Sequence, residues 1–469
     1  MAKRRKKTIP SIEITGIADK GMAVGRTSEG QVVFVDKAIP GDNVDALVIR
    51  KKKGIPFGIV SKYNKFSDDR RDPFCQHFGT CGGCKWQNLD YSAQLKHKHQ
   101  TVVDAMTRIA KIETPVSPII ASPYTENYRN KLEYSFGNRR WLTKEEINNS
   151  EVTERGNALG FHPSGAFDRI VEIEKCHLQE DYGNLIRNHL RAYTLENGYD
   201  YYDAKNHNGL MRNTIFRNNL KGEWMLVVVF GRNDPDKIKA LLDNLVSNFD
   251  SIKSLFYVIN TKMNDSIYDQ DMIHHHGSKY LVEELSGIKY KIGPKSFFQT
   301  NSTQAKVMFD VIKDFAGLTG IQKVYDLYTG LGSIALYVSA EADYVTGIEE
   351  VPDAIRDAID NMEFNKINNC TFYAGDVKDI LTDTFIENHG KPDVVITDPP
   401  RAGMHPEVVN TLLELSSPLV VYVSCNPSTQ ARDIYMMKEK YDILRLQPID
   451  MFPHTHHVEN VALLKLKEV

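Results

Sequence analysis

The chain has 469 residues, of which 41% are hydrophobic and 25% charged, and its formal net charge at pH 7 is −3. This length exceeds what one hydrophobic core usually supports, so it predicts two or three domains. The small net charge excludes a protein-wide cationic field that would attract nucleic acid. The sequence has no apolar run of the roughly 20 residues that span a bilayer, and its basic start lacks the apolar block of a secretory signal. We therefore expect a soluble, cytoplasmic protein without membrane contact.

Residues 1–63 contain five short runs of strand character, separated by turns such as SEGQ and IPGD. Short strands at this spacing predict a small, closed, OB-like β-barrel, because closure removes exposed sheet edges. Barrels of this kind commonly bind oligonucleotides. An inert accessory module has the same pattern, and composition does not separate the two.

Residues 64–290 join a cysteine-containing segment to a series of strand-like runs. Between Ser92 and Ile112, apolar residues such as Leu95, Val102 and Ile109 recur at helical spacing. This helical stretch, within residues 91–125, is a candidate to pack on the C-terminal domain. Strand-like runs follow near 131–138, 158–165, 169–176, 210–218, 224–231 and 254–260, with one helix near 236–246. The pattern predicts a central antiparallel α+β domain.

Residues 291–469 alternate short apolar strands with helical segments. The strands are expected at 323–330, 344–350, 370–375, 393–400 and 419–427, and the helices at 302–316, 332–340, 352–366, 404–415 and 427–440. This alternation predicts an open, mostly parallel, doubly wound sheet of Rossmann-like type. Residues 441–467 predict two further strands joined by a loop.

A cofactor site is indicated where the first of these strands ends. Asp326 closes an apolar run, and the chain turns through Gly330 and Gly332, which let the backbone approach a ligand closely. Glu349 ends the next strand about 20 residues later, where a carboxylate can bind a ribose diol. Because a full G-x-G-x-x-G is missing, S-adenosylmethionine is favoured over a dinucleotide. A plain strand-to-helix turn is the alternative.

Two more strands deliver reactive groups to the same edge. Asp398 ends one strand, and the two prolines that follow fix the backbone around it. Cys425 ends the next strand, in VVYVSCNPST, where a thiolate can act as a nucleophile. A structural cysteine and a plain Asp-Pro turn are the alternatives.

The stretch Asp398-Pro-Pro-Arg-x-Gly403, followed after 16 residues by Val420-Val-Tyr-x-Ser-Cys425-Asn-x-x-Thr429, resembles the signature of RNA uracil carbon-5 methyltransferases acting on tRNA and 23S ribosomal RNA. The resemblance extends over essentially the whole chain. Residues 1–63 are similar to the family's RNA-binding TRAM barrel, and FFQTN and DLYTGLGS are similar to its cofactor-binding stretches. It implies that residues 291–469 form an S-adenosylmethionine-dependent methyltransferase domain and that residues 64–290 contribute to RNA binding.

The resemblance also implies roles for individual residues. Cys425 would add to carbon 6 of uracil, making carbon 5 nucleophilic, and Glu459 would remove the carbon-5 proton after methyl transfer. The residues implied to contact S-adenosylmethionine are Gln299, Tyr328, Ser333, Glu349, Asp376 and Asp398. Asp376 has an alternative role as a helix cap.

Four of the six cysteines form a second candidate site. The spacing Cys75-x5-Cys81-x2-Cys84, with the distant Cys176, suits either tetrahedral zinc or an iron–sulfur cluster. Spacing alone does not separate the two. The resemblance, to members with this pattern, favours a structural 4Fe-4S cluster.

The resemblance therefore implies an RNA (uracil-5-)-methyltransferase, and the barrel with the four cysteines is similar to the family members that act on 23S rRNA. We expect the protein to be a monomer. Alternatives are a tRNA uracil-C5 methyltransferase, a DNA cytosine carbon-5 methyltransferase, and a noncatalytic RNA-binding or ribosome-assembly protein. Local polyanion sites are candidates at three basic runs, which are Lys3 to Lys7, Lys51 to Lys53 and the run from Lys96. Each run could equally be a solvated surface.

Overall fold

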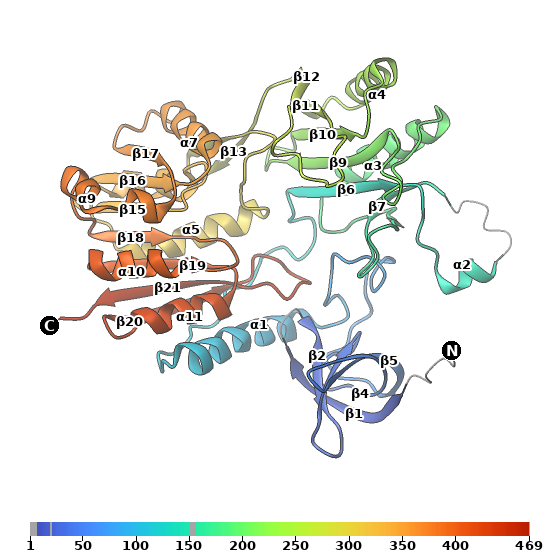
Figure 1. The fold of residues 1–469 in the computed structure, drawn as a ribbon, viewed down its shortest axis with the longest axis horizontal. Coiled ribbons are helices and arrows are strands. Elements are labelled where there is room, and N and C mark those ends of the chain that lie inside the picture. The colour runs from blue at the N-terminus through green and yellow to red at the C-terminus, as the bar shows by residue number, and fades with distance from the viewer. Residues whose placement is uncertain (1–6, 19–20, 150–155, 469) are drawn as a thin grey trace.

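The computed structural model describes residues 7–18, 21–149 and 156–468, which form three bodies (Figure 1). A small barrel lies at the bottom of the view, a central sheet at the upper right, and a helix-covered sheet at the left. No helix in these described ranges is both long and apolar enough to cross a membrane. Of the basic run from Lys3 to Lys7, only Lys7 lies among the described residues.

The N-terminal body is a closed barrel with strand order β1-β2-β3-β5-β4, which confirms the predicted architecture of this region. Alternate residues such as Ile12, Val33 and Val44 fill its interior, as the period of two in a strand requires. Its strands are β1 (Thr8–Ile17), β2 (Ala23–Arg26), β3 (Val32–Asp36), β4 (Asn43–Lys52) and β5 (Ile55–Lys65). The turn between β4 and β5 exposes Lys51, Lys52 and Lys53.

The central sheet has seven strands in the order β12-β11-β10-β9-β6-β7-β8. Its elements are β6 (Lys131–Gly137), α2 (Lys144–Asn148), β7 (Ala158–Phe161), β8 (Val171–Glu172), α3 (Asp181–Glu196), β9 (Met211–Asn218), β10 (Trp224–Phe230), α4 (Pro235–Asn248), β11 (Ile252–Ile259) and β12 (Ile273–Gly277). Helices α3 and α4 pack on one face, against the core that contains Trp224.

The prediction of a purely antiparallel central domain is wrong at one pair of strands. β10 and β11 are parallel because α4 carries the chain back between them as a crossover. The strands predicted at 158–165 and 169–176 are shorter in the structure, where they correspond to β7 and β8. Helix α3 was missed, because its buried positions include Gly183, Asn184 and Arg187, which blur the apolar periodicity.

The C-terminal sheet has the strand order β17-β16-β15-β18-β19-β21-β20. Strands β15 (Lys323–Leu327), β16 (Tyr344–Glu349), β17 (Cys370–Ala374), β18 (Val394–Thr397) and β19 (Leu419–Ser424) are parallel, whereas β20 (Tyr441–Ile449) and β21 (Glu459–Leu466) are antiparallel neighbours. This arrangement is the mostly parallel sheet that the alternating pattern predicted.

Helices cover both faces of this sheet. One core contains residues of α5 (Ser302–Ala316), α6 (Ser333–Val338), α7 (Pro352–Phe364) and the hairpin of β13 (Leu281–Leu285) and β14 (Ile288–Ile292). A short 3-10 helix at Ser339–Glu341 follows α6. The other core contains residues of α8 (Val377–Ile380), α9 (Asp383–His389), α10 (Pro406–Leu415), α11 (Pro427–Met437) and α1 (Tyr91–Ala105). Helix α1, although distant in sequence, thus completes one layer beside α11 (Figure 1).

Helix α1 differs in detail from its expected pattern. It passes into a π-helical turn at Met106–Ala110, where Ile109 becomes exposed instead of buried. Lys98, one of the candidate cations of the basic run from Lys96, is fully buried, and its ammonium group donates to the Asp450 carboxylate at 2.6 Å. Lys98 is therefore a structural residue that holds the segment before β21, and it is inaccessible to a polyanion.

Candidate active site

The side chains expected at the cofactor site lie where the parallel strands end. The loop after β15 is held by Asp326, whose carboxylate accepts hydrogen bonds from the Thr329 hydroxyl at 2.5 Å and the Ala335 amide at 3.1 Å. Tyr328 adopts a left-handed backbone with φ 63°. That conformation costs a non-glycine residue about 1 kcal/mol or more, and such strain gathers at functional sites.

Glu349 ties the neighbouring strand to this loop. Its carboxylate accepts from the Gly330 amide at 3.2 Å and from the Val351 amide at 3.0 Å. A carboxylate has about four acceptor positions, so it can still bind hydroxyl groups of a ligand. Gly330 has φ 57°, where a side chain would be strained. The tight loop and the carboxylate therefore form one unit at the strand edge.

The other residues implied to bind the cofactor lie around this unit. Asp376 caps α8 by accepting from the Lys378 amide, and its charge raises the pKa of the Tyr328 hydroxyl, although burial is the larger cause. Ser333 is the first residue of α6. Gln299 lies before α5, and its backbone carbonyl accepts from the Asn130 side chain at 3.0 Å. Among the described residues, no hydrogen bond or ion pair joins the Gln299 or Ser333 side chains to the rest of this group.

Strand pairing brings Cys425 and Glu459 together. β19 and β21 are antiparallel, and Ser424 pairs with Asn460. One step further along this ladder places Cys425, after the end of β19, opposite Glu459, the first residue of β21. If β21 ran parallel to β19, its first residue would lie at the opposite edge of the sheet from Cys425. Because β21 is antiparallel, its start lies at the edge where the parallel strands end.

Buried carboxyl groups dominate the electrostatics here. Burial, with the nearby Asp398, raises the pKa of Glu459 to about 8. The pKa of Asp398 rises to about 7, mainly through burial and also through Asp326. The pKa of the Cys425 thiol is raised to about 11, first by burial and then by the charges of Glu459 and Asp398. Glu459 is consequently poised to exchange a proton near neutral pH, whereas Cys425 is held mainly as the thiol.

Arg401 is a residue of this site that the sequence analysis did not identify, although it follows Asp398 within the stretch Asp398-Pro-Pro-Arg. Its side chain lowers the pKa of both Cys425 and Glu459, opposing the carboxyl groups, and it hydrogen-bonds to the Cys425 thiol. Its backbone carbonyl accepts from Asn426 at 3.1 Å, which ties the Arg401 turn to the start of α11. Only the folded arrangement shows that this cation faces the thiol, because 23 residues separate them in sequence.

The four cysteines of the second candidate site approach one another from two segments. The charges of Cys75, Cys81 and Cys176 each raise the pKa of the Cys84 thiol, which reaches about 12, with burial as the main cause. Four thiolates are a donor set that suits iron or zinc. Within the part of the chain that the structure describes, however, no group of three or more Cys, His, Asp or Glu side chains is arranged to hold a metal ion.

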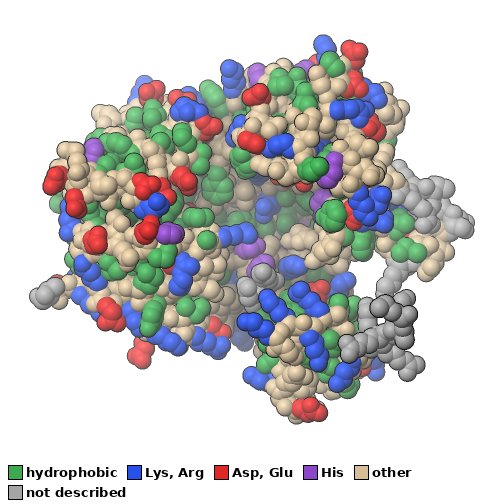
Figure 2. Space-filling model, in the orientation of Figure 1, with side chains coloured by type: hydrophobic (Ala, Val, Ile, Leu, Met, Phe, Trp, Pro, Cys, Tyr) green, Lys and Arg blue, Asp and Glu red, His purple; other side chains and the backbone are tan. Residues whose placement is uncertain are grey.

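The space-filling view shows a hollow where the three bodies meet, with lysine, arginine and histidine side chains along it (Figure 2). A polyanion gains electrostatic attraction in such a recess even when the net charge of the protein is slightly negative. The hollow therefore concentrates cationic side chains where the three bodies meet.

Comparison with known families gives two matches. The model of the tRNA (Uracil-5-)-methyltransferase family matches residues 203–467, and the TRAM domain model matches residues 5–60. A relative from Bacteroides thetaiotaomicron is 49% identical over 96% of this chain and 100% of its own length. One from Porphyromonas gingivalis is 48% identical over 97% of this chain and 99% of its own. Both carry the name RNA methyltransferase.

Among solved structures, the chain is similar to the Pyrococcus abyssi tRNA (uracil-54, C5)-methyltransferase in complex with S-adenosyl-L-homocysteine. The TM-score is 0.74 at 27% identity, over 96% of this chain and 99% of that one. The family models, the relatives and this similar structure agree on one family. The chain belongs to the family of S-adenosylmethionine-dependent RNA uracil-5-methyltransferases that carry a TRAM domain.

Proposed function

We propose that the protein forms 5-methyluridine in RNA through a transient covalent bond between Cys425 and the target uracil. The observation that carries the proposal is the meeting of a thiol, a carboxyl group with a pKa of about 8 and a cation at one strand edge, in Cys425, Glu459 and Arg401. A nucleophile alone would serve many reactions. A nucleophile beside a separate base suits one that must both add to a ring and remove a proton.

The steps follow from the chemistry of uracil. The Cys425 thiol gives its proton to solvent water, and the thiolate Sγ bonds to carbon 6, so that the electrons of the double bond between carbons 5 and 6 move toward oxygen 4 as an enolate. S-adenosylmethionine supplies the methyl group that carbon 5 then takes. Glu459 accepts the proton on carbon 5, the double bond re-forms, and the bond between Sγ and carbon 6 breaks. Arg401 stabilises the thiolate at the beginning and the end of this cycle.

The cofactor would lie over the Tyr328 loop. We propose that Glu349 binds its ribose and that Gln299, Tyr328, Ser333, Asp376 and Asp398 line the rest of its site. The fixed geometry of the Asp326 and Glu349 hydrogen bonds supports this proposal, because a preformed loop lowers the entropy lost on binding. The target uridine must be unpaired or flipped out, since carbon 6 is inaccessible in a stack.

We propose 23S rRNA as the substrate, on the family resemblance of the barrel and the four cysteines. tRNA is the second candidate, because the Pyrococcus abyssi enzyme named for tRNA covers almost the whole chain, barrel included. Barrel and length thus do not by themselves separate the two substrates. All proposed catalytic groups come from one chain, which supports action as a monomer, and light scattering on the purified protein checks this.

We further propose that Cys75, Cys81, Cys84 and Cys176 hold a structural 4Fe-4S cluster. Burial raises the pKa of the Cys81, Cys84 and Cys176 thiols, and neighbouring cysteines raise it further, so a cationic group among them would offset the repulsion of their thiolates. Purification without oxygen, followed by iron and zinc analysis, tests the proposal. About four irons and four sulfides per chain support it, and stoichiometric zinc or no metal contradicts it.

The activity is tested with the purified protein, isotope-labelled S-adenosylmethionine and separate pools of 23S rRNA, tRNA and DNA. We expect 5-methyluridine in one RNA pool, none in DNA, and none with Cys425→Ala. Mass spectrometric mapping then identifies the uridine. Methyl transfer that survives Cys425→Ala would contradict the mechanism, and labelled DNA or the absence of any labelled RNA would contradict the function.

A further inference from the structure

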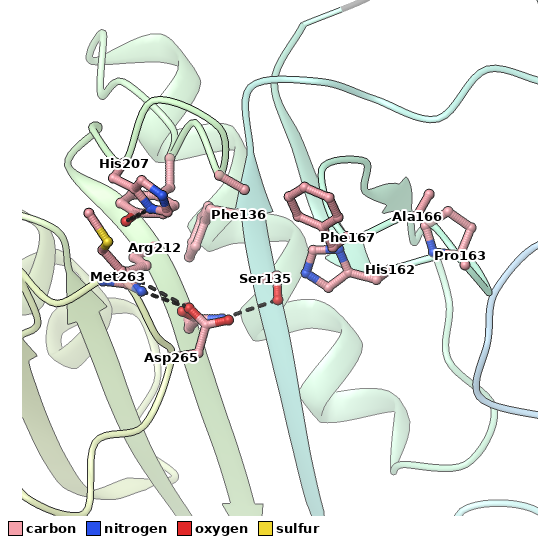
Figure 3. Close-up of a pocket in the computed structure, with 14 residues that line it drawn as sticks. Ser135, Phe136, His162, Pro163, Ala166, Phe167, His207, Arg212, Met263 and Asp265 are labelled. Atoms are coloured by element: carbon pink, nitrogen blue, oxygen red, sulfur yellow. Dashed lines mark hydrogen bonds and ion pairs between the residues drawn. The ribbon is translucent and has the colours of Figure 1, made fainter.

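A cavity of about 550 Å³ lies in the central body, well separated in the chain from the catalytic residues (Figure 3). Its walls come from β6 and β9, the loop after β7, the loop before β9 and the loop after β11. The volume falls within the range of small-ligand sites. None of the proposed catalytic or cofactor-binding residues lines it.

The floor of the cavity is a polar pair on the open face of the sheet. Ser135 on β6 pairs with Asn213 on β9, and the Asn213 amide donates to the Ser135 hydroxyl at 3.1 Å. Asn213 is 6% exposed, and its carbonyl oxygen Oδ1 has no hydrogen-bond partner in the described structure. A buried, unpaired acceptor is unfavourable by about 1–3 kcal/mol, and a ligand that donates a hydrogen bond would satisfy it.

One wall is aromatic and unusually exposed. Phe167 is 69% exposed and stands beside His162 at the mouth of the cavity (Figure 3). The His162 ring is oriented by the Arg169 carbonyl, at 3.0 Å from Nδ1. A large apolar ring left in water beside a second flat ring is suited to receive a planar ligand by stacking.

The opposite wall is held rigid. Arg212 is buried under the loop and donates to the carbonyl groups of Asn260 at 2.8 Å, Lys262 at 2.6 Å and Asn264 at 2.7 Å. Arg212 also donates to Oδ1 of Asp265 at 2.9 Å. This bond fixes the Asp265 carboxylate at the rim of the cavity as a second acceptor, beside the Asn213 amide oxygen. The acceptor groups of Asn213 and Asp265 therefore do not need to be ordered by the ligand.

Strand β6 connects the cavity with the segment of Gln299, a proposed cofactor-site residue. Asn130, just before β6, binds the Gln299 segment, and Ser135 lies five residues further along. At the rise of an extended strand, Ser135 is about 17 Å along the chain from Asn130, so β6 leads from the segment of Gln299 to the floor of the cavity. Acidic Asp265 and Glu133 near the cavity disfavour a phosphate group but suit the amino group of a base.

We propose that this cavity binds one unpaired nucleobase of the substrate RNA, distinct from the target uridine, by stacking on Phe167 and hydrogen bonding to Asn213. Because Asn213 Oδ1 and Asp265 are acceptors, the bound ring is one that carries an exocyclic amino group, so adenine, cytosine or guanine is favoured over uracil. The inference rests on the proposed function, since it makes the central body a reader of the sequence near the modified site.

The test compares binding of five-nucleotide oligomers of adenosine, cytidine and uridine by the intact protein, measured by fluorescence anisotropy. Phe167→Ala should weaken binding of the adenosine and cytidine oligomers by at least about fivefold, the loss expected for one stacked base, and leave the uridine oligomer little changed. His162→Ala should act in the same direction. Leu185→Ala is the matched control, because it truncates an exposed side chain on α3, against the other face of the sheet.

Equal affinities of Phe167→Ala and the unsubstituted protein for all three oligomers would overturn the proposal, provided that melting curves show both folded. Once the RNA that the protein methylates is identified, Phe167→Ala should raise the KM for that RNA and preserve kcat. Loss of oligomer binding in a protein that transfers no methyl group would uphold the cavity and refute the proposed function. Unchanged KM with intact methyl transfer would do the reverse.

Discussion

At the scale of single residues, burial of the Glu459 carboxyl group connects catalysis with stability. Its pKa is about 8 in the folded protein and near the ordinary value of 4.5 when unfolded. The folded state therefore binds more protons between these values, and the contribution of this group to stability, complete below about pH 4.5, is lost as the pH rises through 8. The burial that gives the proposed base this pKa therefore lowers the stability of the fold at alkaline pH.

Glu459→Gln should remove this dependence. We expect the variant to be more stable than the unsubstituted protein at pH 8, by up to about 4 kcal/mol for a pKa raised from 4.5 to about 8, with the difference shrinking toward pH 5. Urea unfolding at several pH values measures it. Glu468→Gln, at an exposed ion pair, is the control that should show no such trend. A difference that is constant from pH 5 to 8 would show that Glu459 titrates normally.

Arg401 should control the reactivity of the thiol. Because its guanidinium lowers the pKa of Cys425 against the effect of the carboxyl groups, Arg401→Gln should shift the alkylation of Cys425 by iodoacetamide to higher pH. Peptide mass spectrometry follows the modification rate at this position. Arg401→Lys retains a positive charge, so its alkylation profile should lie between those of Arg401→Gln and the unsubstituted protein. An unchanged pH profile in Arg401→Gln would show that Arg401 does not promote formation of the Cys425 thiolate.

At the scale of elements, helix α1 is attached to the catalytic body by a buried ion pair. Lys98 and Asp450 are both fully buried, and Asp450 also accepts from the Tyr91 hydroxyl at 2.9 Å. Lys98→Met should destabilise the protein by about 3–5 kcal/mol, because it leaves the carboxylate buried without its cation. The double variant Lys98→Met with Asp450→Asn should recover much of this loss in urea unfolding. Additive losses would contradict the pairing.

Regular alternation explains which elements the sequence predicted well. Helix α5 was expected at 302–316 and occupies those residues, because an Asn301 cap, an apolar stripe and Gly317 mark both ends. The closed barrel followed from short strands and turns. Helix α3 was missed because its buried face includes polar residues that blur the apolar periodicity. The parallel pairing of β10 with β11 was missed because it depends on α4 acting as a crossover between the two strands.

The candidate site was predictable to a similar extent. Strand ends supplied Asp398 and Cys425, because parallel strands end at one edge. Glu459 needed the family resemblance, since β21 runs in the opposite direction. The role of Arg401 and the cavity beside Asn213 depend on how loops fold over the sheets, so no spacing rule could indicate them.

At the scale of the whole molecule, the barrel should contribute affinity more than chemistry. The turn between β4 and β5 exposes Lys51, Lys52 and Lys53, so replacing all three by Gln should weaken RNA binding. The slope of log affinity against log salt should fall by up to about 2, at about 0.7 per phosphate contact with single strands, while kcat is unchanged. Replacement by Arg should preserve both quantities. An unaltered slope would place the RNA away from this turn.

The most direct test of the covalent mechanism uses substrate RNA in which 5-fluorouridine replaces the target uridine. Fluorine at carbon 5 leaves no proton for Glu459 to remove, so the bond between Cys425 and carbon 6 should persist after methyl transfer. The account predicts a denaturation-resistant protein–RNA adduct, mapped by mass spectrometry to Cys425 and absent from Cys425→Ala. A methylating protein that forms no such adduct, or that forms it equally well as Cys425→Ala, would contradict the account.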